Sequence, residues 1–226
     1  NKPKPLNIII LSQKQGCVML KIGVLASTRA TDLQAVIDAI NSKKLNAEIS
    51  VLISNKKDAY ALERAKKQDI NAFFIDIKKY SYMSKEKQRE SFDKEVSNIL
   101  EDNKVGLILL IGYLKFLSPW FVNKYRNRIM NIHPSLLPKY PGMDREVHAE
   151  VLRNGEKITG ATLHFVDEGT DTGPIIMQKE VKIEENETVD SLKEKVQKAE
   201  QEIIVQAVDL FERGKIKVEK NKVIIK

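Results

Sequence analysis

The short segment N-I-H-P places Asn131 and His133 two positions apart. Residues at this spacing on an extended backbone point to the same side, so the two side chains would face a common space. An amide N–H can bind a carbonyl oxygen, and an imidazole can move a proton near neutral pH. Pro134, Pro138 and Pro141 disfavour a helix directly downstream. The alternative interpretation is a surface loop with a buried, hydrogen-bonded histidine.

A candidate carboxylate partner lies further along the chain, in the stretch HFVDEGTDTGPI. Gly169 and Gly173 bracket Asp171 there, a pattern typical of a turn between strands. A carboxylate in this turn could meet His133 and set which ring nitrogen carries the proton. With Asn131, the three groups would supply a donor to a carbonyl oxygen, an acid–base group and a proton relay. The alternative is that Asp171 only forms the turn.

The other histidines fit structural roles better. His164 lies in a β-like run, which favours a core or cross-strand position, and His148 falls in a short helical stretch, on a pocket wall or on the surface. Together with His133 they show no paired spacing typical of a metal site. Cys17 is the only cysteine, which excludes an internal disulfide and a cysteine-built metal centre. We therefore expect no metal.

Apolar runs alternate with helical patterns through the first half of the chain. The runs lie at residues 22–26, 49–53, 72–75 and 106–111, and the helical patterns at 32–40, 58–68 and 84–103. Such alternation is typical of a parallel sheet buried on both faces by helices.

The second half predicts a different arrangement. Two β-like segments lie at 159–166 and 174–183, and the alternation in the second indicates an antiparallel strand with one wet face. A long helix over 188–213 and a hairpin with Asn221 near its turn follow. We expect an N-terminal extension over 1–18, one α/β domain over 19–214 and a C-terminal β tail over 215–226.

Two loops after strands are candidate ligand sites. The loop ASTRATD follows the first strand and precedes a helix, so its N–H groups could bind a phosphate; an ordinary capped turn is the alternative. The loop GYLKFLSP follows the strand 106–111, at the edge where open parallel sheets bind ligands. Its apolar residues could line a slot, or the loop could only cover the core.

The composition limits the partners. The net charge is +7, from 38 Lys and Arg against 31 Asp and Glu, which favours an anionic ligand. Aromatic residues make up only 6% of the chain and lysines are dispersed, whereas a nucleic-acid-binding protein more often shows a concentrated basic stripe with aromatic residues. A phosphate-bearing or polyanionic small molecule fits the charge equally well, and we expect no nucleic-acid partner. No apolar run approaches the ~20 residues of a membrane span, and no cleavage site follows the first apolar run. We expect a cytoplasmic protein without a membrane partner; a homodimer is an option.

Four motifs in order resemble the glycinamide ribonucleotide formyltransferase family: DLQAVIDAI, GYLKFLSP, NIHPSLLPKYPG and TGATLHFVDEGTDTGPII. The resemblance runs from about residue 21 to 214. It implies a Rossmann-like α/β fold with helices on both faces of a mostly parallel sheet. It also implies transfer of a formyl group from the co-substrate 10-formyltetrahydrofolate to the amine of glycinamide ribonucleotide, a step of purine synthesis.

The resemblance also implies roles for single residues. Asn131 and protonated His133 would stabilise the oxyanion, and Asp171 would relay the proton from the amine to the departing folate nitrogen. The folate would lie against Leu114, Lys115, Phe116, Leu117, Val166, Asp167 and Glu168. The ribonucleotide would lie against Thr28, Arg29, Ala30, Thr31 and Asp32 of the first loop and Glu200 of the last helix.

The first loop departs from the family pattern. The family's phosphate loop is typically S-G-x-G-S-N, whereas this chain reads STRATD. Thr28 and Ala30 replace the two glycines, and Asp32 stands where an asparagine is usual. A carboxylate facing a phosphate is unfavourable unless it is compensated or turned away, and Arg29 could compensate it.

Three other functions fit part of the pattern. A methionyl-tRNA formyltransferase, or a transferase with another amine acceptor, shares the Asn-x-His and Asp elements, but usually carries a further C-terminal domain. A formyltetrahydrofolate hydrolase resembles the GAT-H-V stretch, but normally has an N-terminal regulatory domain. A non-catalytic nucleotide-binding module would explain the altered loop, but the retention of Asn131, His133 and Asp171 argues against it.

Overall fold

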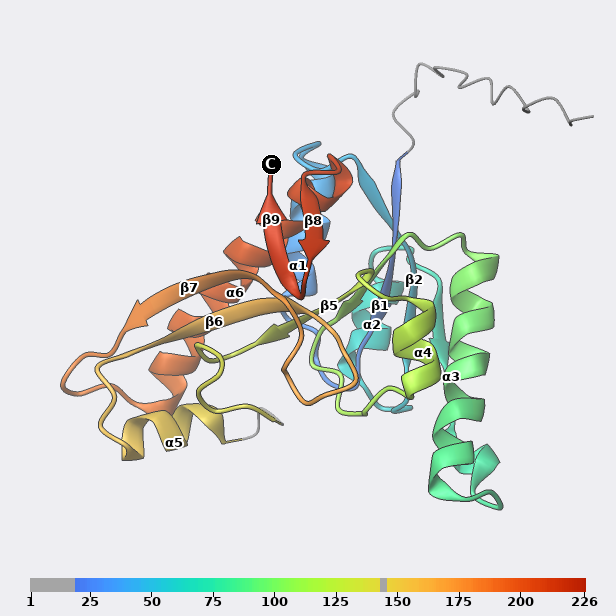
Figure 1. Cartoon of the computed structure of the whole chain (residues 1–226), viewed down its shortest axis with the longest axis horizontal. Helices are drawn as coiled ribbons and strands as arrows, with labels where there is room; N and C mark the ends of the chain where they lie inside the picture. The colour runs from blue at the N-terminus through green and yellow to red at the C-terminus, as the bar shows by residue number, and fades with distance from the viewer. Residues whose placement is uncertain (1–18, 143–145) are drawn as a thin grey trace, which may run out of the picture.

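The computed structural model describes residues 19–142 and 146–226; the expected extension over 1–18 lies outside them. Within these ranges the chain forms a seven-stranded sheet in the order β3-β2-β1-β4-β5-β6-β7 (Figure 1). The strands from β3 to β5 are parallel, and β6 and β7 are antiparallel. The strands are β1 (Leu20–Leu25), β2 (Ala47–Ser54), β3 (Ala72–Phe74), β4 (Leu107–Leu110), β5 (Ile129–His133), β6 (Ile158–Phe165) and β7 (Ile175–Lys182).

Helices connect the strands and cover both faces. They are α1 (Leu33–Asn41), α2 (Tyr60–Lys66), the 3-10 turn η1 (Ile77–Tyr80), α3 (Lys85–Asp102), α4 (Pro119–Lys124), α5 (Val147–Arg153) and α6 (Val189–Glu212). A separate hairpin of β8 (Ile216–Glu219) and β9 (Lys222–Ile225) follows α6, and Ile216, Val218 and Val223 pack against the core.

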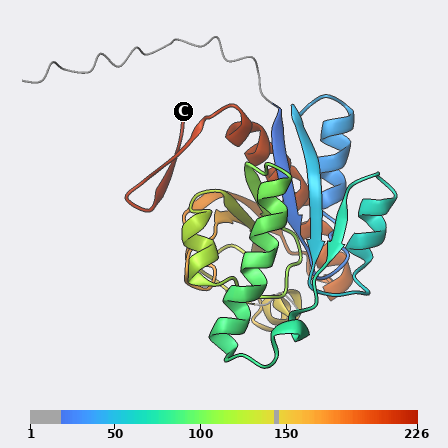
Figure 2. The ribbon, with the colours of Figure 1, turned by 90° about the vertical axis from the view of Figure 1, so that its right-hand side faces the viewer.

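Alternate residues of the central strands pack into two apolar layers. In β4, Leu107 and Leu109 face the layer built with α1, α2, α5 and α6, whereas Ile108 and Leu110 face α3 and α4. Figure 2 shows α3 and α4 on one side of the strands and α1 and α2 on the other. Since each buried Leu or Ile contributes about 1.5–3 kcal/mol, the wholly apolar strand belongs at the centre of the sheet.

The long last helix follows its predicted stripe. Thr188 caps its first turn, and Leu192, Val196, Ala199 and Ile203 are buried against the sheet. This periodicity is the one expected of an amphipathic helix on a core. It places Glu200, which lies beside the stripe, at the same end of the molecule as the loop that follows β1.

The strand order reverses between β1 and β4, and the loops after these strands therefore diverge to open a crevice. They remain bonded at its base: the Ser27 N–H donates to the Gly112 carbonyl at 3.0 Å, and Ser27 Oγ accepts from the Leu114 N–H at 2.8 Å. Gly112 has φ +58°, and a Cβ there would lie 2.1 Å from Thr28 Oγ1. Only glycine lets the two loops approach this closely.

The predicted fold class is confirmed, including the antiparallel strands, the long last helix and the hairpin. The sequence pattern did not predict α4 and η1. The start of α4 has a recognisable signal, because Ser118 Oγ accepts from the Phe121 N–H and Pro119 occupies the first turn. This helix closes the loop after β4 against the sheet.

Candidate active site

The last residues of β5 present polar side chains to the ligand edge of the sheet. Met130 and Ile132 pack in the layer of α1 and α6, so the alternation of the strand turns Asn131 and His133 to the face of α3 and α4. The predicted common orientation of Asn131 and His133 therefore holds. Asn131 is the antiparallel partner of His164 on β6, and its Nδ2 lies 3.1 Å from His164 Nε2.

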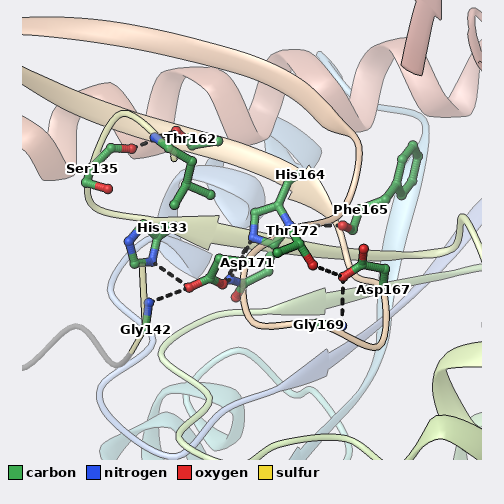
Figure 3. Close-up of polar contacts among 12 residues, drawn as sticks. His133, Ser135, Gly142, Thr162, His164, Phe165, Asp167, Gly169, Asp171 and Thr172 are labelled. Carbon is green, nitrogen blue, oxygen red and sulfur yellow. Dashed lines mark hydrogen bonds and ion pairs between the residues drawn. The ribbon is translucent and has the colours of Figure 1, made fainter. Parts of the chain in front are cut away.

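Asp171 enters the same space from the loop between β6 and β7 (Figure 3). Its Oδ2 lies 3.6 Å from His133 Nδ1, and its Oδ1 lies 3.4 Å from His164 Nε2. Asn131 Nδ2 also donates to Oδ1 at 3.3 Å. The carboxylate thus stands between two imidazoles, and the amide, imidazole and carboxylate expected from the spacing come together.

In each imidazole, a contact with a backbone carbonyl indicates which ring nitrogen carries the hydrogen, and this nitrogen differs between the two histidines. His133 Nε2 lies 2.6 Å from the Tyr140 carbonyl oxygen, and His164 Nδ1 lies 2.9 Å from the Phe165 carbonyl oxygen. A carbonyl only accepts, so each of these nitrogens carries a hydrogen. The nitrogens that face Asp171 are Nδ1 of His133 and Nε2 of His164, which carry no hydrogen in the neutral rings.

The Asp171 carboxyl is held in its charged form. Burial alone would raise its pKa. The contact with His164, the hydrogen bond from the Gly142 N–H at 2.8 Å and the charges of the two imidazoles outweigh burial and lower the pKa below its ordinary value. A carboxylate that stays charged can orient and balance a protonated imidazole beside it.

The loop that carries Asp171 is braced by its own side chains. Asp167 Oδ1 accepts from the Gly169 N–H at 3.0 Å and from Thr172 Oγ1 at 2.8 Å. Asp171 itself has φ +53°, a left-handed conformation that aspartate tolerates better than most residues. A Cβ on Gly173 would lie 1.8 Å from the Phe165 carbonyl oxygen, so this position needs glycine.

A cavity of about 400 Å³ opens over this cluster. Asn131, His133 and Asp171 lie on its wall, together with His164 and Gly142. All seven residues expected to bind folate line the same cavity: Leu114, Lys115, Phe116, Leu117, Val166, Asp167 and Glu168. Arg89 of α3, which sequence analysis did not name, also lines it.

A second cavity of about 520 Å³ lies beside the first. It is lined by every residue expected to bind the ribonucleotide: Thr28, Arg29, Ala30, Thr31, Asp32 and Glu200. Lys193 and Gln197 of α6 add a cation and an amide. Gly112, Leu114 and Ile132 line both cavities, so the two spaces adjoin at the loop after β4 and at β5.

The altered first loop keeps a glycine-like backbone without glycine at its centre. Ala30 has φ +46°, in the left-handed region that disfavours a residue with a Cβ. Arg64 of α2 donates to the Arg29 carbonyl at 3.2 Å, and the Arg29 guanidinium lies 5.5 Å from the centre of the Tyr60 ring. Asp32 is buried at 7% exposure and lines the second cavity.

The loop over the first cavity rests on a buried ion pair that sequence analysis missed. Lys115 Nζ lies 2.9 Å from Oδ1 of the fully buried Asp93 on α3, and the Ser118 N–H donates to Oδ2 at 2.5 Å. The Lys115 ammonium also lies 4.5 Å from the Phe92 ring centre. Burial lowers the pKa of Lys115, and Asp93 opposes that shift.

His164 makes one contact that was not predicted from the sequence. It does occupy the expected cross-strand position, but it also contacts Asp171 and lines the first cavity. The signal available in the sequence was its proximity to the Gly-flanked turn that carries Asp171. The contacts of Tyr140 and Gly142 had no such signal, because both act through backbone atoms.

Within 19–142 and 146–226, no group of three His, Cys, Asp or Glu side chains is arranged to hold a metal ion. No helix in those ranges has the length and apolar character needed to cross a bilayer.

Comparisons with a family model and with known proteins agree on one family. The family model described as formyl transferase matches residues 20–208. Phosphoribosylglycinamide formyltransferase of Escherichia coli is 34% identical over 202 residues, which cover 89% of this chain and 92% of that protein. The trifunctional purine biosynthetic protein adenosine-3 of Chironomus tentans is 41% identical over 200 residues, which cover 88% of this chain and 14% of that longer protein.

A solved structure agrees in fold and length. The crystal structure of glycinamide ribonucleotide transformylase 1 from Symbiobacterium toebii superposes with a TM-score of 0.86 and is 37% identical in sequence. The match covers 93% of this chain and 95% of that chain.

Proposed function

The chain belongs to the formyl transferase family, and from this membership we propose that it is a phosphoribosylglycinamide formyltransferase. The reaction takes a formyl group from 10-formyltetrahydrofolate and attaches it to the amine of glycinamide ribonucleotide. Formyltetrahydrofolate is the co-substrate of this family. The observation that carries the proposal is the position of Asn131, His133 and Asp171 on the wall of one cavity, next to a second cavity with the altered phosphate loop.

The first cavity suits the folate. Its apolar residues, among them Leu114, Leu117 and Val166, offer flat contact to a ring system, and the catalytic cluster lies on the same wall. Folate supplies the formyl group. The side chains of the cluster bind the oxygen of that formyl group and relay the proton that the attacking amine loses.

The second cavity suits the phosphorylated acceptor. Arg29 and Lys193 provide positive charge, and Glu200 provides a hydrogen-bond acceptor for ribose hydroxyls. Because the two cavities share Gly112, Leu114 and Ile132, an amine held in one can reach a formyl carbon held in the other.

The proposed reaction is a direct displacement. The amine forms a C–N bond to the formyl carbon, the bond to the folate nitrogen breaks, and one proton passes from the amine to the departing nitrogen. Asn131 Nδ2 and the proton on His133 Nδ1 stabilise the negative charge that develops on the formyl oxygen. Asp171 balances the imidazolium and relays the proton. The amide and imidazole contacts to Asp171, at 3.3 and 3.6 Å, are long enough to exchange for contacts to substrate.

The test is an assay with two readouts. Purified protein with 10-formyltetrahydrofolate and glycinamide ribonucleotide should release tetrahydrofolate and yield the formylated ribonucleotide by mass spectrometry. Release of tetrahydrofolate without any amine would indicate the hydrolase instead. Formylation of another amine at a higher kcat/KM would reassign the acceptor while keeping the reaction class.

A further inference from the structure

The short segment 138–142 contacts both members of the His133–Asp171 pair. The Tyr140 carbonyl accepts from His133 Nε2 at 2.6 Å, and the Gly142 N–H donates to Asp171 Oδ2 at 2.8 Å. One loop therefore sets the orientation of the imidazole and of the carboxylate together. Its own position must be fixed by something outside the cluster.

Tyr140 is the strained residue of this loop. Its φ is +55°, in the left-handed region that a residue with a large side chain rarely adopts. Such a conformation persists only where surrounding contacts hold it. Two of these contacts come from the side chain: the Tyr140 hydroxyl donates to Glu156 Oε1 at 3.0 Å and accepts from Asn154 Nδ2 at 3.0 Å. On the backbone side, Ser135 Oγ lies 2.6 Å from the Lys139 carbonyl oxygen and 3.4 Å from the Tyr140 carbonyl oxygen.

Asn154 and Glu156 belong to the turn between α5 and β6, and neither lines the two cavities. Glu156 is held in turn by Lys139, whose ammonium lies 3.0 Å from both carboxylate oxygens. These contacts lower the pKa of Glu156, so the acceptor of the Tyr140 hydroxyl stays charged. The clasp formed by Tyr140, Asn154 and Glu156 thus reaches the site only through the Tyr140 backbone.

We propose that Tyr140 is a positioning residue for His133, and that the clasp keeps its carbonyl where it holds the Nε2–H tautomer of the imidazole. With Nε2 occupied, proton exchange is confined to Nδ1, the nitrogen that faces Asp171. Loss of the Tyr140 hydroxyl releases the strained backbone, and the neutral imidazole then exchanges between its two tautomers. The catalytic consequence rests on the proposed function, whereas the tautomer itself does not.

The experiment is nitrogen NMR of the full chain labelled with ¹⁵N-histidine, without substrate. Only three histidines contribute, and the contacts to Tyr140 and Phe165 predict opposite neutral tautomers for His133 and His164. Tyr140→Phe should convert the His133 signal from the Nε2–H form to an averaged mixture and leave His164 unchanged. In the transferase assay the same variant should lose about 10-fold in kcat with little change in either KM.

Two control variants separate positioning from general damage. Tyr82→Phe removes a hydroxyl from a tyrosine that is 79% exposed and should change neither readout. Lys139→Ala breaks the outer ion pair but leaves the Tyr140–Glu156 bond, and should retain the His133 tautomer.

Glu156→Ala serves where Tyr140→Phe fails to fold, and it should shift the His133 tautomer in the same direction. A single Nε2–H tautomer for His133 in both Tyr140→Phe and Glu156→Ala would overturn the proposal, even if both variants were less stable. A shifted tautomer in a protein with no formyl transfer would uphold the clasp and reject the proposed function.

Discussion

His133 Nδ1 lies 3.6 Å from Asp171 Oδ2, although His133 is the last residue of β5 and Asp171 lies in the loop that follows the neighbouring strand β6. Asp171 reaches His133 because β6 pairs antiparallel with β5 and the following turn brings the chain back over the C-terminal end of β5. The imidazole is held from its other side by the Tyr140 carbonyl. The imidazole and the carboxylate are therefore held close to each other, as the proposed proton relay requires.

Removal of either partner should disable turnover. His133→Ala and Asp171→Asn are each expected to lower kcat by at least ~100-fold, the low end for positioned acid–base groups. Steady-state kinetics with both substrates measures this. Asp209→Asn, which breaks a surface pair with Arg213 on α6, is the matched control and should keep the full rate. A near-full rate in His133→Ala or Asp171→Asn would remove that residue from the mechanism.

The lowered pKa of Asp171 has a defined pH signature. A carboxyl whose pKa is lower in the folded than in the unfolded protein stabilises the fold above the unfolded value of about 3.9, and this stability is lost as the pH falls through the folded value. The difference in free energy of unfolding between the protein and Asp171→Asn should therefore shrink as the pH drops from 7 towards 3. Urea denaturation at each pH measures it. A difference that grows on acidification would mean that burial dominates and the pKa is raised.

Ala30→Gly should relieve strain in the first loop. Ala30 has φ +46°, and a residue without a Cβ adopts this conformation without steric cost. We expect a gain of about 0.5–1 kcal/mol in the free energy of unfolding, after allowance for the greater freedom of glycine in the unfolded chain. The matched control is Ala35→Gly in α1, which should lose about 1 kcal/mol. Equal losses in both variants would show that φ at position 30 carries no strain.

Asp32→Asn tests the acceptor cavity. Asp32 is buried and lines the second cavity beside Arg29, so its charge opposes a phosphate bound there. Replacing the carboxylate by an amide should lower the KM for glycinamide ribonucleotide by about 3–10-fold, since two like charges about 4 Å apart in water repel by about 1 kcal/mol, and should leave the KM for folate unchanged. An unchanged ribonucleotide KM would place the phosphate elsewhere in the cavity.

The Asp93–Lys115 pair should stabilise the loop after β4 only while both partners are present. Asp93 is fully buried, and the Lys115 side chain is 9% exposed. Lys115→Met leaves a buried carboxylate without its cation and should lower the free energy of unfolding by about 3–5 kcal/mol. The double variant Asp93→Leu with Lys115→Met removes both charges and should recover part of that loss. If the double variant is as unstable as the sum of the two single ones, the pair is not coupled.

The sequence by itself determined the alternation of strands and helices, because apolar runs and helical stripes are local signals of what a residue buries. It also identified Asn131, His133 and Asp171 as candidate catalytic residues, since residues two apart on a strand share a side and a glycine-flanked aspartate marks a turn. Their roles, and those of the two ligand loops, remain predictions.

Only the tertiary structure decided how these groups are held. The contact of His164 with Asp171 depends on the register between β5 and β6, and the support of Lys115 depends on how α3 packs beneath the loop. The hold on His133 comes from the Tyr140 carbonyl, and every residue has a carbonyl. Such contacts join distant parts of the chain through groups that leave no pattern in the order of side chains, so they exist only once the fold has formed.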